Sequence, residues 1–186
     1  MEMVNFLGHT DRQGLREWLE QNHSTEKECS VVIRRGAPSE NVLWYVDAVE
    51  EALCFGWIDS TLRELPTGEN VQRFVPRRKD SHWSELNKER CRRLERLGLM
   101  TDAGRAVMPD LDEEFVISDD ILKALQEDAE AWENFLSFPE LYRRIRIGNI
   151  ESVRKDGKAF DERLKKLAET SKAGRMYGQW NDYGRL

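Results

Sequence analysis

The residues best suited to binding a ligand lie in one stretch, from Glu50 to Asn87. Within it, the helix-capping serines Ser81 and Ser84 are preceded by three consecutive cations, which are Arg77, Arg78 and Lys79. A helix N-terminus carries free backbone N–H groups and a partial positive charge, so cations beside it favour an anion. The pattern predicts a site for a phosphate, sulfate or carboxylate. In the alternative interpretation a serine only caps the helix, Trp83 packs in the core and the cations are solvated.

A second group in the same stretch belongs to a predicted hairpin. Trp57 and Asp59 are two residues apart on a strand, so their side chains share a face. Arg73 on the paired strand is then placed to form an ion pair with Asp59. In the alternative interpretation, the Trp57 side chain forms the floor of a pocket and Asp59 orients a polar group of the ligand. The complete set of predicted ligand-binding residues is Trp57, Asp59, Arg73, Arg77, Arg78, Lys79, Ser81, Trp83, Ser84 and Asn87.

No spacing in the sequence specifies a reaction. Glu50 and Glu51 are adjacent on a predicted helix and do not share a face, which argues against a paired acid and base. His82 follows Ser81 directly, but neighbouring residues of a helix point apart, so a serine–histidine nucleophile is not indicated. Cys54 belongs to an apolar helix face and is interpreted as a core residue. The sequence therefore assigns no catalytic residue and leaves open whether the protein is an enzyme.

Composition indicates a globular protein. The chain has 186 residues, a net charge of −6, and 39% hydrophobic and 34% charged residues. No apolar run approaches the roughly 20 residues of a membrane span, and the N-terminus lacks the pattern of a secretion signal, so we expect a cytoplasmic location and no membrane partner. Three cysteines without a C-x-x-C pair and three histidines without ligand spacing predict neither disulfides nor a metal site. We expect no cofactor.

Helix and strand signals alternate in the first half of the chain. Thr10 or Asp11 can cap a helix ending near Asn22, and Ser39 or Asn41 can begin another that Gly56 ends. A hairpin is predicted around the turn Pro66 to Glu69, and a further helix from Ser81 or Ser84 through Leu97. The strands of the predicted sheet are Ile58 to Leu65, Val71 to Val75 and, as a third member, Val31 to Arg34.

The second half of the chain shows helical periodicity. A short helix from Thr101 precedes one continuous helical pattern from Ile121 to Leu136, and the further predicted helices are Leu141 to Arg154 and Ala159 to Thr170. The tail from Met176 is rich in glycine and aromatic residues and is expected to fold back on the body. These patterns predict one α+β domain over residues 1–186. Its α+β part is 1–100, with a small antiparallel sheet of a hairpin plus one strand, and the all-helical part, 101–186, packs on it.

Three blocks carry a resemblance to a known family: VEEALCFGWIDS, RFVPRRKDSHWSELNKERC and LGLMTDAGRA. With these blocks in this order, the chain resembles the bacteriocin-protection, YdeI/OmpD-associated family of small bacterial cytoplasmic proteins. The resemblance runs from Trp18 through Met100 and extends through Phe138 to Arg144, and the chain departs from the family beyond Ile150. It implies an α+β bacterial protein located in the cytoplasm. It carries over no catalytic residue.

The sequence leaves three classes of function open. The first is a binding protein for a small anionic ligand. The second is a protein-interaction or stress-response module, since Arg73 to Arg96 has nine Lys/Arg and four Asp/Glu whereas Thr101 to Glu133 has two and eleven. The third is an enzyme acting on a phosphorylated or carboxylated substrate. Nucleic acid is disfavoured as a partner because the chain is acidic overall and its aromatics are not interleaved with the basic run. The sequence does not determine the oligomeric state.

Overall fold

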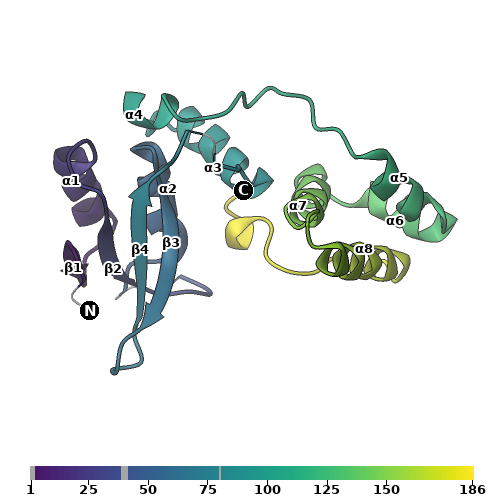
Figure 1. Cartoon of the computed structure of the whole chain (residues 1–186), viewed down its shortest axis with the longest axis horizontal. Coiled ribbons are helices and arrows are strands. Elements are labelled where there is room, and N and C mark those ends of the chain that lie inside the picture. The colour runs from purple at the N-terminus through teal and green to yellow at the C-terminus, as the bar shows by residue number, and fades with distance from the viewer. Residues whose placement is uncertain (1–2, 39–41, 80) are drawn as a thin grey trace. The chain divides into compact units, whose positions relative to one another are not determined.

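The computed structural model describes residues 3–38, 42–79 and 81–186 (Figure 1). The chain forms two compact units. The first comprises Met1–His82 with Arg90–Pro109, and the second comprises Trp83–Glu89 with Asp110–Leu186. The strands of the described chain all lie in the first unit, and the second is built from helices, which confirms the predicted α+β class with a helical second half. The predicted packing of the helical part on the sheet stays a prediction.

The sheet of the first unit has the strand order β1-β2-β4-β3 (Figure 1). Its strands are β1 (Phe6–Gly8), β2 (Cys29–Ile33), β3 (Trp57–Glu64) and β4 (Asn70–Pro76). β3 and β4 form the predicted antiparallel hairpin, and β2 pairs antiparallel with β4 as the predicted third strand. The sequence analysis missed β1, which pairs parallel with β2 at the edge of the sheet. A strand of only three residues carries too little alternation to be recognised from its sequence.

A β-bulge interrupts the hairpin. Asp59 stands opposite Phe74, whereas Leu62 stands opposite Gln72, so Ser60 and Thr61 together oppose a single residue of β4. Side chains alternate between the two faces of a sheet, and the extra residue reverses that alternation along β3. Residues of β3 after the bulge therefore face the opposite side from the one that uninterrupted alternation from Asp59 would give them.

Helices α1 (Arg12–Asn22) and α2 (Tyr45–Cys54) lie on the face of the sheet that carries Trp57 and Asp59. The Trp57 indole N–H donates to the backbone oxygen of His23, which caps the end of α1, at 3.2 Å. Tyr45 at the start of α2 donates its hydroxyl to Asp59 at 2.8 Å. The predicted starting residues of this helix, Ser39 and Asn41, lie outside the described residues, and α2 begins at Tyr45.

The end of α2 approaches the short helix α4 (Asp102–Arg105) very closely. The Thr101 hydroxyl donates to the backbone oxygen of Cys54 at 2.5 Å, and an added Cβ at Gly104 would lie 2.4 Å from the same oxygen. Gly56 ends α2 with a positive φ of 74°, as predicted, and a Cβ there would lie 2.8 Å from the Ala103 oxygen. Glycine at both positions permits this backbone contact.

The second unit has its own apolar core. Its helices are α5 (Asp119–Gln126), α6 (Ala129–Ser137), α7 (Glu140–Glu151) and α8 (Gly157–Lys172). Fully buried side chains from all four helices meet there, namely Ile121, Leu125, Phe135, Ile147, Ile150 and Leu167. The prediction of one continuous helical pattern from Ile121 to Leu136 was wrong, because Asp128 accepts a hydrogen bond from the Ala131 N–H and begins a second helix.

The C-terminal tail folds back on α7, as predicted. Tyr177 donates its backbone N–H to the Tyr142 hydroxyl at 3.3 Å, and the Trp180 ring meets the buried Tyr142 ring edge-on at 6.0 Å. Arg146 donates to the backbone oxygen of Gln179 at 3.0 Å and lies over the Tyr177 ring. Cation–π and aromatic contacts therefore hold the tail. None of the helices in the described residues is long and apolar enough to cross a membrane.

Candidate functional site

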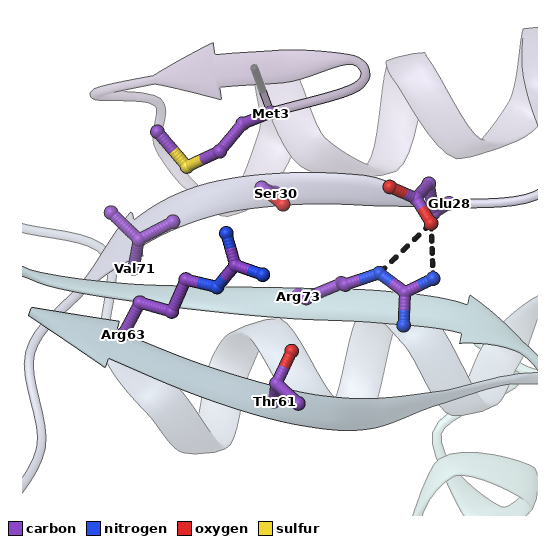
Figure 2. Close-up of a pocket in the computed structure, with 7 residues that line it drawn as sticks. All are labelled: Met3, Glu28, Ser30, Thr61, Arg63, Val71 and Arg73. Atoms are coloured by element: carbon purple, nitrogen blue, oxygen red, sulfur yellow. Dashed lines mark hydrogen bonds and ion pairs between the residues drawn. The ribbon is translucent and has the colours of Figure 1, made fainter. Parts of the chain in front are cut away.

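A pocket of about 290 Å³ lies on the sheet face opposite the one that carries Trp57 and Asp59 (Figure 2). This volume is at the small end for ligand sites, which begin at about 300 Å³, so it suits a small metabolite rather than a nucleotide. The pocket is lined by residues of β2, β3 and β4, of the segment before β2 and of the N-terminal segment: Met3, Glu28, Ser30, Thr61, Arg63, Val71 and Arg73.

Strand register brings two arginines to this pocket. Ser30 of β2 stands opposite Arg73 of β4, and Val71 lies two residues before Arg73 on the same face. Arg63 of β3 stands opposite Val71 because the bulge has reversed its face. Arg63 and Arg73 are thus diagonal neighbours on one face, with roots about 7–8 Å apart. Figure 2 shows the Arg63 guanidinium reaching from β3 toward Ser30.

One carboxylate faces the two arginines. Arg73 donates from Nε to Oε2 of Glu28 at 2.9 Å, a second bond from Nη2 ends on the same oxygen, and Nη1 donates to the Ser60 hydroxyl at 3.3 Å. The hydrogen bond from Arg73 lowers the pKa of Glu28, partly opposed by burial and supported by the charges of Arg73 and Arg63. Glu28 is therefore ionised near neutral pH, and among the described residues that line the pocket two side chains are positive and one is negative.

Trp57 and Asp59 do not face this pocket. The predicted ion pair between Asp59 and Arg73 was wrong, because the bulge follows Asp59 and the register places Phe74 opposite it. Asp59 instead accepts the hydroxyl of Tyr45, whose pKa is raised by burial and by the charge of Asp59. Trp57 is 1% exposed and meets Trp18 of α1 edge-on. Of the three hairpin residues predicted to bind a ligand, only Arg73 lines the pocket.

The predicted basic loop, which carries the consecutive cations Arg77, Arg78 and Lys79, has one buried and two exposed cations. Arg77 is 7% exposed, its backbone N–H donates to Gly56 at 2.9 Å, and its Nη2 donates to the His82 oxygen at 2.6 Å. Burial lowers the pKa of Arg77, partly opposed by neighbouring groups. Arg78 and Lys79 are exposed. Ser81 donates its hydroxyl to the Arg78 oxygen at 2.8 Å, so the loop is closed by its own contacts.

The helix that follows this loop, α3 (Glu85–Arg96), is capped by Ser84 rather than Ser81. The Ser84 hydroxyl accepts the Asn87 N–H at 3.2 Å, and Trp83 is buried. Arg77, Arg78, Lys79 and Ser81 belong to the first unit, whereas Trp83, Ser84 and Asn87 belong to the second. The predicted anion site at this helix end stays a prediction.

A second polar centre lies between α1 and α2. Arg12 contacts Glu51 at 2.6 Å and Glu50 at 3.1 Å, so the expectation that these adjacent glutamates would separate was wrong. Both lie on the buried side of α2 and are held by further arginines, Arg93 for Glu50 and Arg16 for Glu51. Full pairing with arginines makes this centre an ion cluster of the core. No group of three or more His, Cys, Asp or Glu in residues 3–38, 42–79 and 81–186 could hold a metal ion.

Sequence reasoning missed every lining residue of the pocket except Arg73, namely Met3, Glu28, Ser30, Thr61, Arg63 and Val71. Glu28 lies just before β2, and its contact with Arg73 depends on the pairing of β2 with β4. Arg63 is odd-numbered like Asp59, so strict alternation assigns it to the wrong face.

Comparison with known families divides the chain into two parts. A family model described as "Domain of unknown function (DUF8412)" matches residues 7–107, and the model described as "Bacteriocin-protection, YdeI or OmpD-Associated" matches residues 114–174. The second match confirms the family resemblance, but it falls on the helical half, whereas the sequence blocks had placed the resemblance mainly on residues 18–100. No curated protein and no solved structure matches the chain.

Proposed function

The chain belongs to the family described as "Domain of unknown function (DUF8412)", and we propose that it binds a small anionic ligand in the pocket on the sheet face opposite Trp57 and Asp59. The observation that carries this proposal is the position of two guanidinium groups, Arg63 and Arg73, on one face beside the hydroxyls of Ser30 and Thr61. The family description names no activity, so the proposal rests on the geometry.

Arginine suits this task because its planar guanidinium binds carboxylate or phosphate through paired hydrogen bonds. Arg73 is already held in place by Glu28 and Ser60, so less conformational entropy is lost when a ligand binds it. Arg63 is exposed, which limits its contribution through screening by salt. The hydroxyls of Ser30 and Thr61 add hydrogen-bonding groups beside the two guanidinium groups. Binding of an anion is therefore the function that this geometry supports best.

The test is calorimetric titration of the protein with phosphate, sulfate, glutarate and glutamate, comparing wild type with Arg63→Gln. A charge-assisted hydrogen bond contributes about 1.5–3 kcal/mol, and the lower value applies to an exposed arginine. The variant should therefore bind the preferred anion about tenfold more weakly. Because Arg63 is exposed, its loss should leave the unfolding midpoint close to that of wild type.

A matched control distinguishes the pocket from the basic loop. Arg78→Ala with Lys79→Ala also removes exposed cations, but these lie outside the pocket lining. The double variant should bind like wild type. Weakened binding in the loop variant with unchanged binding in Arg63→Gln would overturn the pocket proposal and favour the helix-end site instead. Arg77 is unsuitable for this comparison because its side chain holds the loop itself.

A further inference from the structure

Glu28 presents an unused acceptor to the pocket. Both bonds from Arg73 end on Oε2 of Glu28, and within the described part of the chain Oε1 accepts no hydrogen bond. Figure 2 shows this second oxygen directed along the pocket toward Ser30 rather than toward Arg73. The carboxylate is half-buried, so an arriving ligand would displace water from Oε1. A ligand without a donor at this point would leave a desolvated charge unsatisfied, which is unfavourable.

The charges of the lining residues limit the ligand further. With Arg63 and Arg73 positive and Glu28 negative, the best complement carries two negative groups and one positive group. A plain dicarboxylate or a phosphate satisfies the arginines but places a negative charge against Glu28. An ammonium group satisfies Glu28 both as a donor and as a charge.

We propose that the pocket selects an acidic amino acid, whose two carboxylates bind Arg63 and Arg73 and whose ammonium group binds Oε1 of Glu28. This inference rests on the proposed function of the same pocket. The small volume suits such a ligand, and the buried Val71 side chain with Met3 lines an apolar surface against which its methylene groups can pack. The ligand class follows from the arrangement of charges on β3, on β4 and on the segment just before β2.

The test compares glutamate with glutarate, which has the same two carboxylates and no ammonium group. Calorimetry on the wild-type chain should give glutamate about tenfold tighter binding, the effect of one charge-assisted hydrogen bond. In Glu28→Gln the glutamate preference should disappear, because the neutral amide no longer attracts the ammonium group. Thermal unfolding of this variant checks that it is folded, and loss of a partly exposed ion pair should have a small effect.

Different outcomes separate this inference from the proposed function. If glutarate binds as tightly as glutamate and Arg63→Gln weakens both, anion binding stands and the amino-acid inference is wrong. A glutamate preference that persists in Glu28→Gln also overturns it, since the ammonium group would then be bound elsewhere. If none of phosphate, sulfate, glutarate and glutamate binds, both proposals fail.

Discussion

Removal of Arg12 tests whether the ion cluster between α1 and α2 stabilises the first unit. Its guanidinium contacts Glu51 at 2.6 Å, Asp47 at 2.8 Å and Glu50 at 3.1 Å. The side chains of Glu50 and Glu51 are 0% and 2% exposed, so water cannot replace a lost partner. Burial acts to lower the pKa of Arg12, but the attraction of Glu51 and the other carboxylates raises it overall, so the group stays charged. Arg12→Met keeps much of the apolar stem and removes the charge.

The expected loss follows from the contacts that remain. Breaking a buried ion pair by removing one partner costs about 3–5 kcal/mol. Here Glu50 keeps Arg93 at 2.7 Å and Glu51 keeps Arg16 at 2.8 Å, so each glutamate retains one arginine. The loss should therefore be near the lower limit, about 3 kcal/mol. This is a large fraction of a typical folding free energy of about 5–15 kcal/mol.

Denaturation in guanidinium chloride measures this loss as a lower midpoint with an unchanged slope. The control is Lys158→Met, because Lys158 is 87% exposed and lies 3.9 Å from Glu162. That exposed pair should contribute at most about 0.5 kcal/mol. A second variant, Arg12→Met with Glu51→Met, should recover part of the loss, because it restores the balance between arginines and carboxylates in the cluster. A loss below about 1 kcal/mol in Arg12→Met would refute the reasoning.

Gly104→Ala should lower the free energy of unfolding by about 1–3 kcal/mol, because the added Cβ would lie 2.4 Å from a backbone oxygen at the end of α2. Gly157→Ala, where nothing lies within 4 Å, should be neutral or stabilising by up to about 1 kcal/mol in the same denaturation experiment. Trp180→Ala should cost about 0.5–1.5 kcal/mol by loss of its edge contact with α7, and unchanged unfolding would show that the tail does not stabilise that helix. The pKa of Glu28, followed by carboxyl-carbon NMR, should lie below the ordinary range for glutamate because Arg73 donates hydrogen bonds to it. The pair then stabilises the fold above the ordinary pKa and loses that contribution as the pH falls through the lowered value; an ordinary pKa would contradict the contact.

Local signals in the sequence predicted the elements well. Asp11 accepts the Gly14 N–H at 2.7 Å and begins α1, as its residue type and position indicated. Gly56 ends α2, and the turn from Pro66 to Glu69 joins the two hairpin strands. Each of these features depends on residues within a few positions of one another, which is why the sequence alone predicts them.

The pocket could not be predicted in the same way. The residues that line it depend on which residues of β2 and β4 stand opposite each other. Ser30 and Arg73, for example, stand opposite each other although they are 43 positions apart in the sequence. The contact between Arg73 and Glu28 follows from that pairing. Arginines that reach two adjacent glutamates, as Arg12 does, also depend on how α1 packs on α2. Tertiary pairing decides each of these contacts, and periodicity within one segment does not report it.

The bulge in β3 makes the composition of the pocket depend on how this strand pairs with β4. With the same residues and no bulge, uninterrupted alternation from Asp59 would turn Arg63 to the face of Asp59, although no lining arginine had been changed. A related chain could thus keep both arginines and still present a pocket with one cation and a different ligand preference. Loss of the bulge together with one of Ser60 and Thr61 would instead leave Arg63 opposite Val71, so the pairing of Arg63 with Val71 is a better criterion for a shared ligand than the presence of Arg63 itself.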